Sequence, residues 1–161
     1  MDQWQCHKGR WRREFTMTGE EIIQRLPYTS PFLFVDKLIA VSDTGVTGCY
    51  TFDKNLFFYQ GHFKDLPITP GVILTECMAQ IGLVCLGIYL LDKQHEEVQG
   101  VAFAESEMQY FKPVFPGESV RVESVKEYFR FGKLKCKVSM FNTADELVCK
   151  GVLSGMLQKK S

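Results

Sequence analysis

Apolar and polar residues alternate most clearly between positions 134 and 141, LKCKVSMF. Apolar side chains stand at every second position and polar ones lie between them, a pattern that predicts a strand with one buried face and one wet face. Similar strand-like runs fill the C-terminal half, at roughly 99–111, 118–130, 133–142 and 146–157. Turn sequences at Phe131-Gly132-Lys133 and Asn142-Thr143-Ala144-Asp145 separate the last three runs. These runs predict an antiparallel sheet.

The N-terminal half begins with a helix signal. Thr18-Gly19-Glu20-Glu21 fits a capping box, in which Thr18 caps the helix and Glu21 reaches back to the Thr18 backbone. A short helix is expected to follow and to end at about Arg25, before a proline. Two strands joined by a turn at Asp43 to Gly45 come next and predict a hairpin: FLFVDKLIAV (32–41) and VTGCYTF (46–52).

Residues 72–91, VILTECMAQIGLVCLGIYLL, carry a single charge, Glu76. Twenty apolar residues could span a bilayer, but a carboxylate is costly in lipid, and the rest of the chain predicts a soluble sheet. The other interpretation is a helix buried nearly all round. Because a flat sheet covers only one side of a helix, either the sheet must curl around it or a second subunit must cover the rest. The pattern therefore predicts an α+β fold, a sheet wrapped around one central helix, and favours a dimer.

Composition narrows the class of protein. The 161 residues suit one domain, taken as residues 15–161. Residues 1–14 are basic and aromatic without the apolar core of a signal peptide, and we expect a flexible arm there. The 19 basic and 19 acidic residues cancel, which argues against nucleic acid as the main partner. No C-x-x-C pair occurs, and Cys6 beside His7 makes only a weak metal site, so we expect no metal. We also expect a cytoplasmic protein in which all the cysteines are reduced: Cys6, Cys49, Cys77, Cys85, Cys136 and Cys149.

The apolar helix has a distinctive start, Thr69-Pro70-Gly71. Thr69 is expected to cap the helix, and Pro70 suits the first helical position, where its missing N–H is not needed. Gly71 then offers an unobstructed N–H in the first turn. Because helix N-termini carry free donors and a partial positive charge, a carbonyl oxygen that gains negative charge could dock there.

Two ionisable residues flank this start, His62 in the preceding loop and Glu76 in the helix. Histidine is a natural general base near neutral pH, and a carboxyl group in an apolar setting favours its protonated form and can act as an acid. Together they suit proton abstraction next to a carbonyl, followed by loss or gain of water. A lone histidine in a loop is more often structural or exposed, and Pro-Gly alone is only a good helix start. A glutamate inside an apolar helix is harder to explain without function.

Three motifs in order resemble a known family. They are LPYTSPFLFVDKL (26–38), G-H-F-x-x-x-P-x-x-P-G-V-x-x-x-E-x-x-A-Q (61–80) and YFKPVFPGESVRV (110–122). The chain resembles the FabZ-type beta-hydroxyacyl-(acyl carrier protein) dehydratases over roughly residues 15–157. Those are hot dog fold enzymes related to the FabA type. The resemblance therefore implies a hot dog fold here.

The resemblance also implies roles by position. His62 falls on the catalytic histidine and Glu76 on the catalytic acid, which come from different subunits of a dimer. The oxyanion and substrate contacts fall on Gly71 and Val72, and the supporting positions are Gln80, next to the acid, and Phe63, joined to His62 by an often cis peptide. The implied reaction is the reversible dehydration of (3R)-3-hydroxyacyl thioesters to trans-2-enoyl thioesters, without metal or redox cofactor.

The implied partners are an acidic acyl carrier protein and a second copy of the chain, in dimers that often assemble as trimers of dimers; neither nucleic acid nor membrane is expected. A basic rim facing the carrier could include Lys112, Arg121, Arg130, Lys133 and Lys135, although a solvated strand face is the simpler interpretation of each alone.

The chain departs from the family motifs at a few positions. Lys64-Asp65 replaces the usual Pro-Gly, Thr69 the usual Met, and Tyr28 and Thr29 the usual His and Arg. These changes raise the hypothesis of a specialised copy in a secondary pathway, such as aryl-polyene or polyketide synthesis, instead of ordinary fatty-acid synthesis. Two other functions stay open, a hot dog acyl thioesterase and a non-catalytic acyl-carrier-binding subunit.

Overall fold

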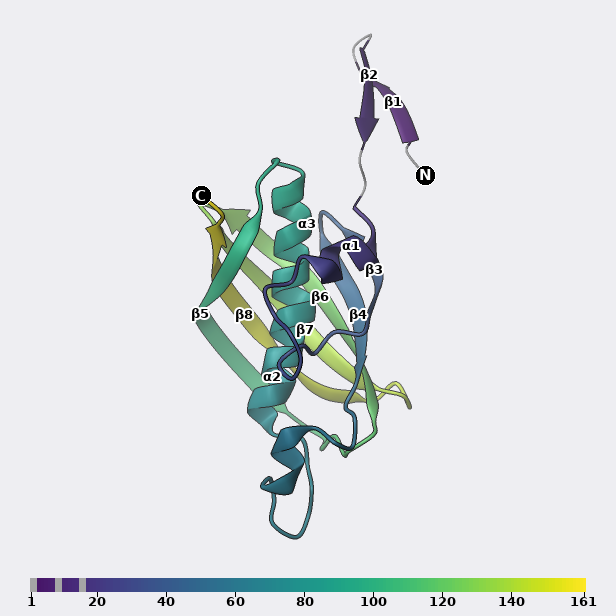
Figure 1. Cartoon of the computed structure of the whole chain (residues 1–161), viewed down its shortest axis with the longest axis vertical. Helices are drawn as coiled ribbons and strands as arrows, with labels where there is room; N and C mark the ends of the chain where they lie inside the picture. The colour runs from purple at the N-terminus through teal and green to yellow at the C-terminus, as the bar shows by residue number, and fades with distance from the viewer. Residues whose placement is uncertain (1–2, 8–9, 15–16) are drawn as a thin grey trace.

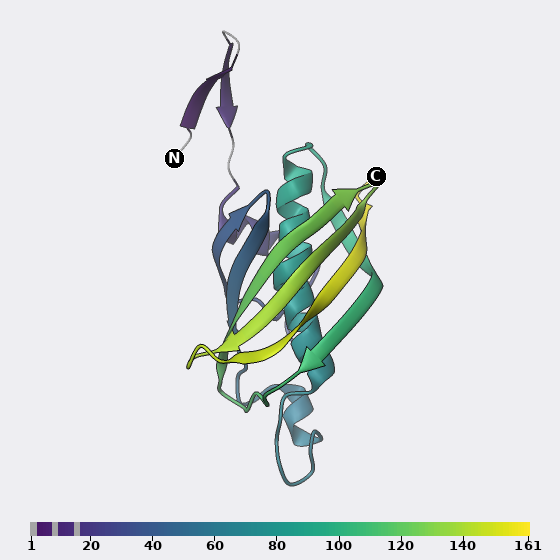
Figure 2. The same ribbon diagram turned by 180° about the vertical axis from the view of Figure 1, so that it is seen from behind.

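A six-stranded antiparallel sheet curves around one long helix in the computed structural model of the chain (Figures 1 and 2). The structure describes residues 3–7, 10–14 and 17–161. The sheet confirms the predicted strands, with the spatial order β3 (Lys37–Ser42), β4 (Gly45–Thr51), β6 (Ser119–Arg130), β7 (Lys133–Asn142), β8 (Leu147–Lys159) and β5 (Val98–Tyr110). The α+β prediction is therefore correct, and β7 buries its predicted alternate residues: Leu134, Cys136, Val138 and Met140.

Two short strands precede this domain. β1 (Gln3–His7) and β2 (Arg10–Glu14) pair antiparallel in a separate two-stranded sheet. The predicted arm spans these strands and also positions 1–2 and 8–9, which lie outside the described residues. The flexibility of the arm stays a prediction.

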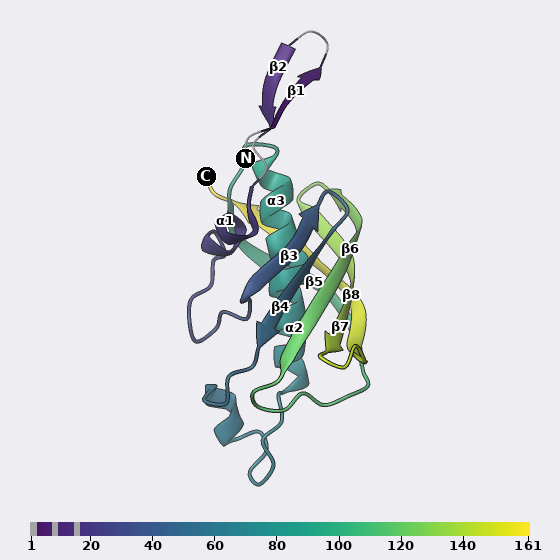
Figure 3. The same cartoon turned by 90° about the vertical axis from the view of Figure 1, so that its right-hand side faces the viewer.

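Helix α1 (Gly19–Gln24) confirms the capping box. The Glu21 N–H donates to Thr18 Oγ1 at 3.2 Å, and the Thr18 N–H donates to Glu21 Oε2 at 2.8 Å. Helix α1 and segment 26–36 cross the side of the long helix that faces away from the sheet (Figures 1 and 3). Ile22 and Phe34 are fully buried there. A single chain therefore covers both sides of the long helix along most of its length.

The long helix has three parts: α2 (Gly71–Ala79), the π-helical segment η2 (Gln80–Cys85) and α3 (Leu86–Asp92). Within the described residues it is the one helix long and apolar enough to cross a membrane, and 72% of its most apolar window is buried inside the protein. Such burial is typical of a core helix. The sequence pattern did not predict the π-helical segment, where Gly82 packs closely and its carbonyl accepts a 2.8 Å hydrogen bond from Ser124 Oγ.

The first predicted strand begins later than expected. Strand β3 starts at Lys37 instead of Phe32, because the backbone of residues 32–34 bonds to a side chain of the long helix. Residues 32–35, FLFV, are all apolar, and such a short run in the sequence does not distinguish a buried loop from a strand.

The tight packing of Gly82 gives a stability prediction. A Cβ at this position would lie 2.9 Å from Val138 Cγ1 and 3.0 Å from Ser124 Cβ, inside a fully buried contact between helix and sheet. We expect Gly82→Ala to lower the free energy of unfolding by about 1–3 kcal/mol, the usual cost of overpacking, as measured by urea denaturation. Gly61→Ala is the matched control, since nothing lies within 4 Å of its added Cβ. Equal stabilities for the two variants would contradict this account of the helix packing.

Candidate active site

The loop that carries His62 is held by hydrogen bonds within itself. It follows the 3-10 helix η1 (Phe57–Gln60), next to the start of α2 at the bottom of Figure 1. The His62 N–H donates to Phe58 O at 3.0 Å, and the Ile68 N–H donates to His62 O at 2.9 Å. The His62–Phe63 peptide is cis, as the resemblance implies, and the two rings stack with centroids 4.1 Å apart. The loop therefore fixes both the backbone and the ring of His62.

The imidazole of His62 has a defined tautomer. Its Nδ1 lies 2.8 Å from the carbonyl oxygen of Ile68. Because a backbone carbonyl can only accept, Nδ1 must carry the proton, and in the neutral ring Nε2 then has a free lone pair. The ring is half-buried and the structure describes no partner for Nε2. His62 is therefore prepared to accept a proton at Nε2.

The start of the long helix differs from the predicted one. Pro70, not Thr69, is the N-cap, and no side chain caps the helix. The Thr69 hydroxyl instead pairs with the Tyr59 hydroxyl at 2.6 Å, in a buried position. The first N–H groups of a helix have no intrahelical acceptor. The N–H groups of Gly71 and Val72 also lack a side-chain cap. Val72 is 75% exposed, which leaves this first turn open to a ligand.

Tyr110 is a site residue that sequence reasoning missed, although it begins the third family motif. A Cβ on Gly71 would lie 3.3 Å from the Tyr110 ring. The Tyr110 hydroxyl makes a short hydrogen bond with the Thr75 hydroxyl. Tyr110 thus packs against one side of the first helical turn, and the glycine lets its ring approach the backbone.

Glu76 and Gln80 form a second polar group, one turn apart on the helix. Gln80 is fully buried, and its Nε2 donates to Glu76 Oε1 at 3.0 Å and to Phe32 O at 3.0 Å. Its Oε1 accepts the Phe34 N–H at 2.8 Å. Every polar atom of the Gln80 amide is thereby used, and one carboxylate oxygen of Glu76 is held in place. The other, Oε2, has no partner that the structure describes.

The burial of Glu76 differs from expectation. The sequence predicted a carboxylate inside a helix buried all round, but Glu76 is only half-buried in the single chain. The reason is its place near the helix start, where α2 extends toward the edge of the sheet (Figure 1). Burial, and after it the charge of Glu76, raises the pKa of Tyr28 to about 12. Tyr28 therefore lies close to Glu76.

The described chain does not join His62 to Glu76 by any hydrogen bond. Apolar side chains in the His62 loop are open to solvent: Phe63 is 54% exposed and Leu66 is also 54% exposed. Such a group of exposed apolar residues is typical of a surface that another molecule covers. The chain therefore presents an exposed apolar surface beside His62.

Three of the five residues of the predicted basic rim are ion-paired within the chain. Lys112 pairs with Glu146, Arg121 with Glu123 and Asp145, and Lys135 with Glu105. Arg130 stacks over the Tyr128 ring, and the structure describes no ion pair for Lys133. Both lie at the β6–β7 turn, where Phe131 is 96% exposed.

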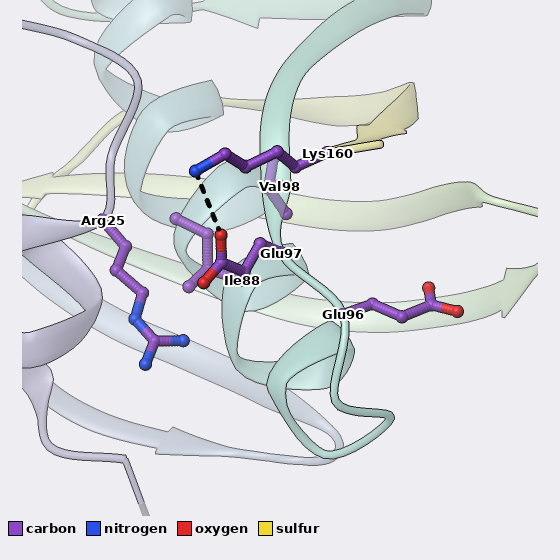
Figure 4. A pocket seen from close by; sticks show the side chains of 6 residues that line it. All are labelled: Arg25, Ile88, Glu96, Glu97, Val98 and Lys160. Carbon is purple, nitrogen blue, oxygen red and sulfur yellow. Dashed lines mark ion pairs between the residues drawn. The ribbon is translucent and has the colours of Figure 1, made fainter.

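A pocket that the structure describes lies at the other end of the long helix (Figure 4). Ile88 lies about 18 Å from Glu76 by the rise of a helix, so this pocket holds none of the predicted site residues. Lys160 pairs with Glu97 at 3.5 Å inside the pocket, whereas Arg25 pairs with Asp92 and Glu96 with Lys159, which do not line it. The residues that line it are Arg25, Ile88, Glu96, Glu97, Val98 and Lys160.

The described cysteine side chains form no disulfide. All five whose side chains the structure describes are free thiols, and burial raises the pKa of Cys136 to about 11 and of Cys149 to about 12. Cys6 lies outside the described side chains. Among the described residues, no group of three or more His, Cys, Asp or Glu side chains could hold a metal ion.

Known proteins resemble this chain in sequence over most of its length. A family model described as a FabA-like domain matches residues 26–150. The 3-hydroxyacyl-[acyl-carrier-protein] dehydratase FabZ of Lactococcus lactis is 31% identical over 147 residues, covering 91% of this chain and 99% of the relative. The FabZ of Ehrlichia ruminantium is 33% identical over 144 residues, covering 87% of this chain and 96% of the relative.

Solved structures show the same fold at lower identity. The dehydratase heterocomplex ApeI:P from Xenorhabdus doucetiae is similar with a TM-score of 0.73 and 15% identity, covering 86% of this chain and 91% of the other. A thioesterase from Haemophilus influenzae is similar with a TM-score of 0.64 and 15% identity, covering 89% and 92%. These likenesses support the predicted hot dog fold.

The Gln80 amide gives a prediction for this site. Gln80→Leu keeps the size of the side chain but leaves the buried Phe34 N–H without an acceptor. We expect the free energy of unfolding to fall by about 1–3 kcal/mol, the cost of an unsatisfied buried group. Urea denaturation measures the change, with Gln24→Leu on the exposed end of α1 as control. An unchanged midpoint for Gln80→Leu would show that the amide does not join helix and loop.

Proposed function

The chain belongs to the FabA-like family, and we propose that it catalyses the reversible dehydration of (3R)-3-hydroxyacyl thioesters on acyl carrier protein to trans-2-enoyl thioesters. Its FabZ relatives bear the name of this activity, and the reaction serves fatty-acid or polyketide-type synthesis. The observation that carries the proposal is the free Nε2 of His62 beside an uncapped helix start. A base and an oxyanion site are what removal of a proton next to a thioester carbonyl requires.

His62 serves as the general base in this proposal. Its Nε2 takes the proton from C2 of the substrate, and the C2–H electron pair moves toward the thioester carbonyl. The imidazolium that forms keeps its Nδ1–H bond to Ile68 O, which stabilises the charge. Phe63 stacks on the ring and limits its rotation.

Glu76 serves as the acid. Its protonated carboxyl donates to the 3-hydroxyl as the C3–O bond breaks, so that water leaves and the C2–C3 double bond forms. Gln80 binds Oε1 of Glu76 and leaves Oε2 for this proton transfer. In the hydration direction the same carboxylate takes a proton from the attacking water.

The N–H groups of Gly71 and Val72 bind the thioester oxygen. Charge develops on this oxygen when C2 loses its proton, and the partial positive charge of the helix N-terminus stabilises it. No acidic residue lies in the first turn of α2 to oppose that charge. Gly71 in particular leaves its own N–H accessible beside the Tyr110 ring.

The functional unit in this proposal is a homodimer in which His62 and Glu76 of one site come from different subunits. Strand β5 supports it, because this thirteen-residue strand is an edge of the sheet and Phe103 on it is 50% exposed. A long edge strand is a natural place for another chain to pair. Three such dimers would make the trimer of dimers that the resemblance implies.

The acyl carrier protein delivers the substrate. Its acidic surface would meet Arg130 and Lys133, which lie at the β6–β7 turn without a described acidic partner. The other three residues of the predicted basic rim are less available, because they are already paired: Lys112, Arg121 and Lys135. A thioesterase would release free thiol from the same acyl thioester. The spacing of His62 and Glu76 favours the dehydratase, and a thiol-release assay separates the two.

The first functional prediction concerns the base and the acid. We expect His62→Ala and Glu76→Gln each to reduce kcat for hydration of a crotonyl thioester by about 10²–10⁴-fold, the usual contribution of a general acid or base. Loss of absorbance of the conjugated thioester measures the rate. His95→Asn and Glu20→Gln are the matched controls, both on exposed positions, and Asn tolerates the positive φ of position 95. Native rates in either site variant would refute the assigned roles.

A second prediction concerns the shared site. Coexpression of His62→Ala and Glu76→Gln chains should give mixed dimers with one intact site, and random mixing should restore about a quarter of the native activity. Differently tagged chains allow purification of the mixed dimer. If each site lay within one chain, the mixed dimer would be as inactive as either parent.

A further inference from the structure

We propose that Tyr59 and Thr69 are positioning residues that hold the imidazole of His62 in its base-competent tautomer. The inference rests on the proposed function of His62. It concerns two buried hydroxyl groups that bond to each other. Their effect would pass through the peptide between Ile68 and Thr69.

This one peptide links the histidine to the body of the protein. Its carbonyl, from Ile68, accepts the Nδ1–H of His62 at 2.8 Å, and its N–H, from Thr69, donates to Val114 O at 2.9 Å. In a trans peptide these two groups point in opposite directions. The fully buried Val114 therefore anchors the peptide that aligns the ring. Hydrogen bonds in such a chain polarise and strengthen one another.

The hydroxyl pair fixes the same peptide from the side. Tyr59 is 6% exposed, Thr69 is 3% exposed, and their oxygens lie 2.6 Å apart. Burial raises the pKa of Tyr59, so this hydroxyl stays protonated and able to donate. Tyr59 belongs to η1, whose Phe58 carbonyl also receives the His62 N–H. The pair thus ties the chain before His62 to the chain after it.

Thr69 is also a position where this chain departs from the motif it resembles, which usually has methionine. A methionine side chain has no hydroxyl for Tyr59. The Tyr59–Thr69 bond is therefore a feature of this sequence, and the buried place of Thr69 assigns the departure to the support of His62 instead of to contact with the acyl chain.

The test compares three variants with the native protein. Thr69→Val keeps the shape and removes the hydroxyl, Thr69→Ser keeps the hydroxyl, and Tyr59→Phe with Thr69→Val removes both partners and leaves no orphan group. We expect Thr69→Val and the double variant to lower kcat for crotonyl thioester hydration by about 10- to 100-fold with little change in KM, since small misplacement of a catalytic group costs this much. Thr69→Ser should keep most of the native kcat.

The control is Thr51→Val. It removes a hydroxyl from a similar pair, with Ser119 at 2.6 Å, in an exposed pairing of strands β4 and β6 that has no hydrogen bond to the His62 loop, and it should leave kcat unchanged. Nitrogen-15 NMR of the ring reports the tautomer directly. The chain has three histidines, and the His62 signals are the ones that His62→Ala removes. We expect the Nδ1–H form alone in the native protein and a mixture of tautomers without the Thr69 hydroxyl.

Several outcomes would overturn the inference and leave the proposed function intact. Native kcat and a single Nδ1–H tautomer in Thr69→Val would do so, as would a loss of activity in Thr69→Ser equal to that in Thr69→Val. If Thr69→Val does not fold, the double variant is judged by the same two measurements. A native protein that does not hydrate the thioester would instead refute the proposed function, while the tautomer would still test the hydroxyl pair.

Discussion

Burial of the apolar helix from Gly71 to Asp92 is the constraint on which the rest of this structure depends. Its residues from Cys77 to Leu91 are all buried in the single chain, which requires a curved sheet on one side and α1 with segment 26–36 on the other. The sheet and segment 26–36 do not cover the N-terminal turns of this helix. Only the first turns of α2 emerge, and they carry the uncapped N–H groups and Glu76. The same packing that stabilises the fold thus leaves the one polar end of the helix accessible.

Polar groups at this end are oriented by neighbours that are themselves fully bonded. Gln80 uses its whole amide to join Glu76 to the backbone of Phe32 and Phe34. The peptide between Ile68 and Thr69 likewise uses both of its groups, one on His62 and one on Val114. A buried polar group that lacks a partner is costly, so each network has few alternative arrangements. Because breaking these networks would leave buried polar groups without partners, Glu76 and His62 are held in fixed positions.

Local signals in the sequence predicted the elements but not the contacts between them. The capping box at Thr18 and the alternation along β7 depend on residues close in sequence, and both predictions were correct. Strand β3 was predicted too early because the backbone of Phe32 and Phe34 bonds to Gln80, a long-range contact. Thr69 was predicted to cap the helix because the sequence does not reveal Tyr59 beside it. The half-burial of Glu76 was missed because it depends on where the sheet ends. His62, Glu76 and Gln80 could be chosen from the motif, whereas Tyr59 and Tyr110 required the structure.

The residues that depart from the family motif lie in different surroundings. Thr69 lies inside the protein, bonded to Tyr59. Lys64 and Asp65 are exposed within a tight turn closed by backbone hydrogen bonds between Phe63 and Leu66, and this turn lies next to His62. Tyr28 is the departure on the other side, close enough to Glu76 for its charge to raise the Tyr28 pKa. A hypothesis of altered substrate specificity rests better on Tyr28 and the turn at Lys64 than on Thr69, since Tyr28 lies close to Glu76 and the turn is exposed beside His62, whereas Thr69 is buried.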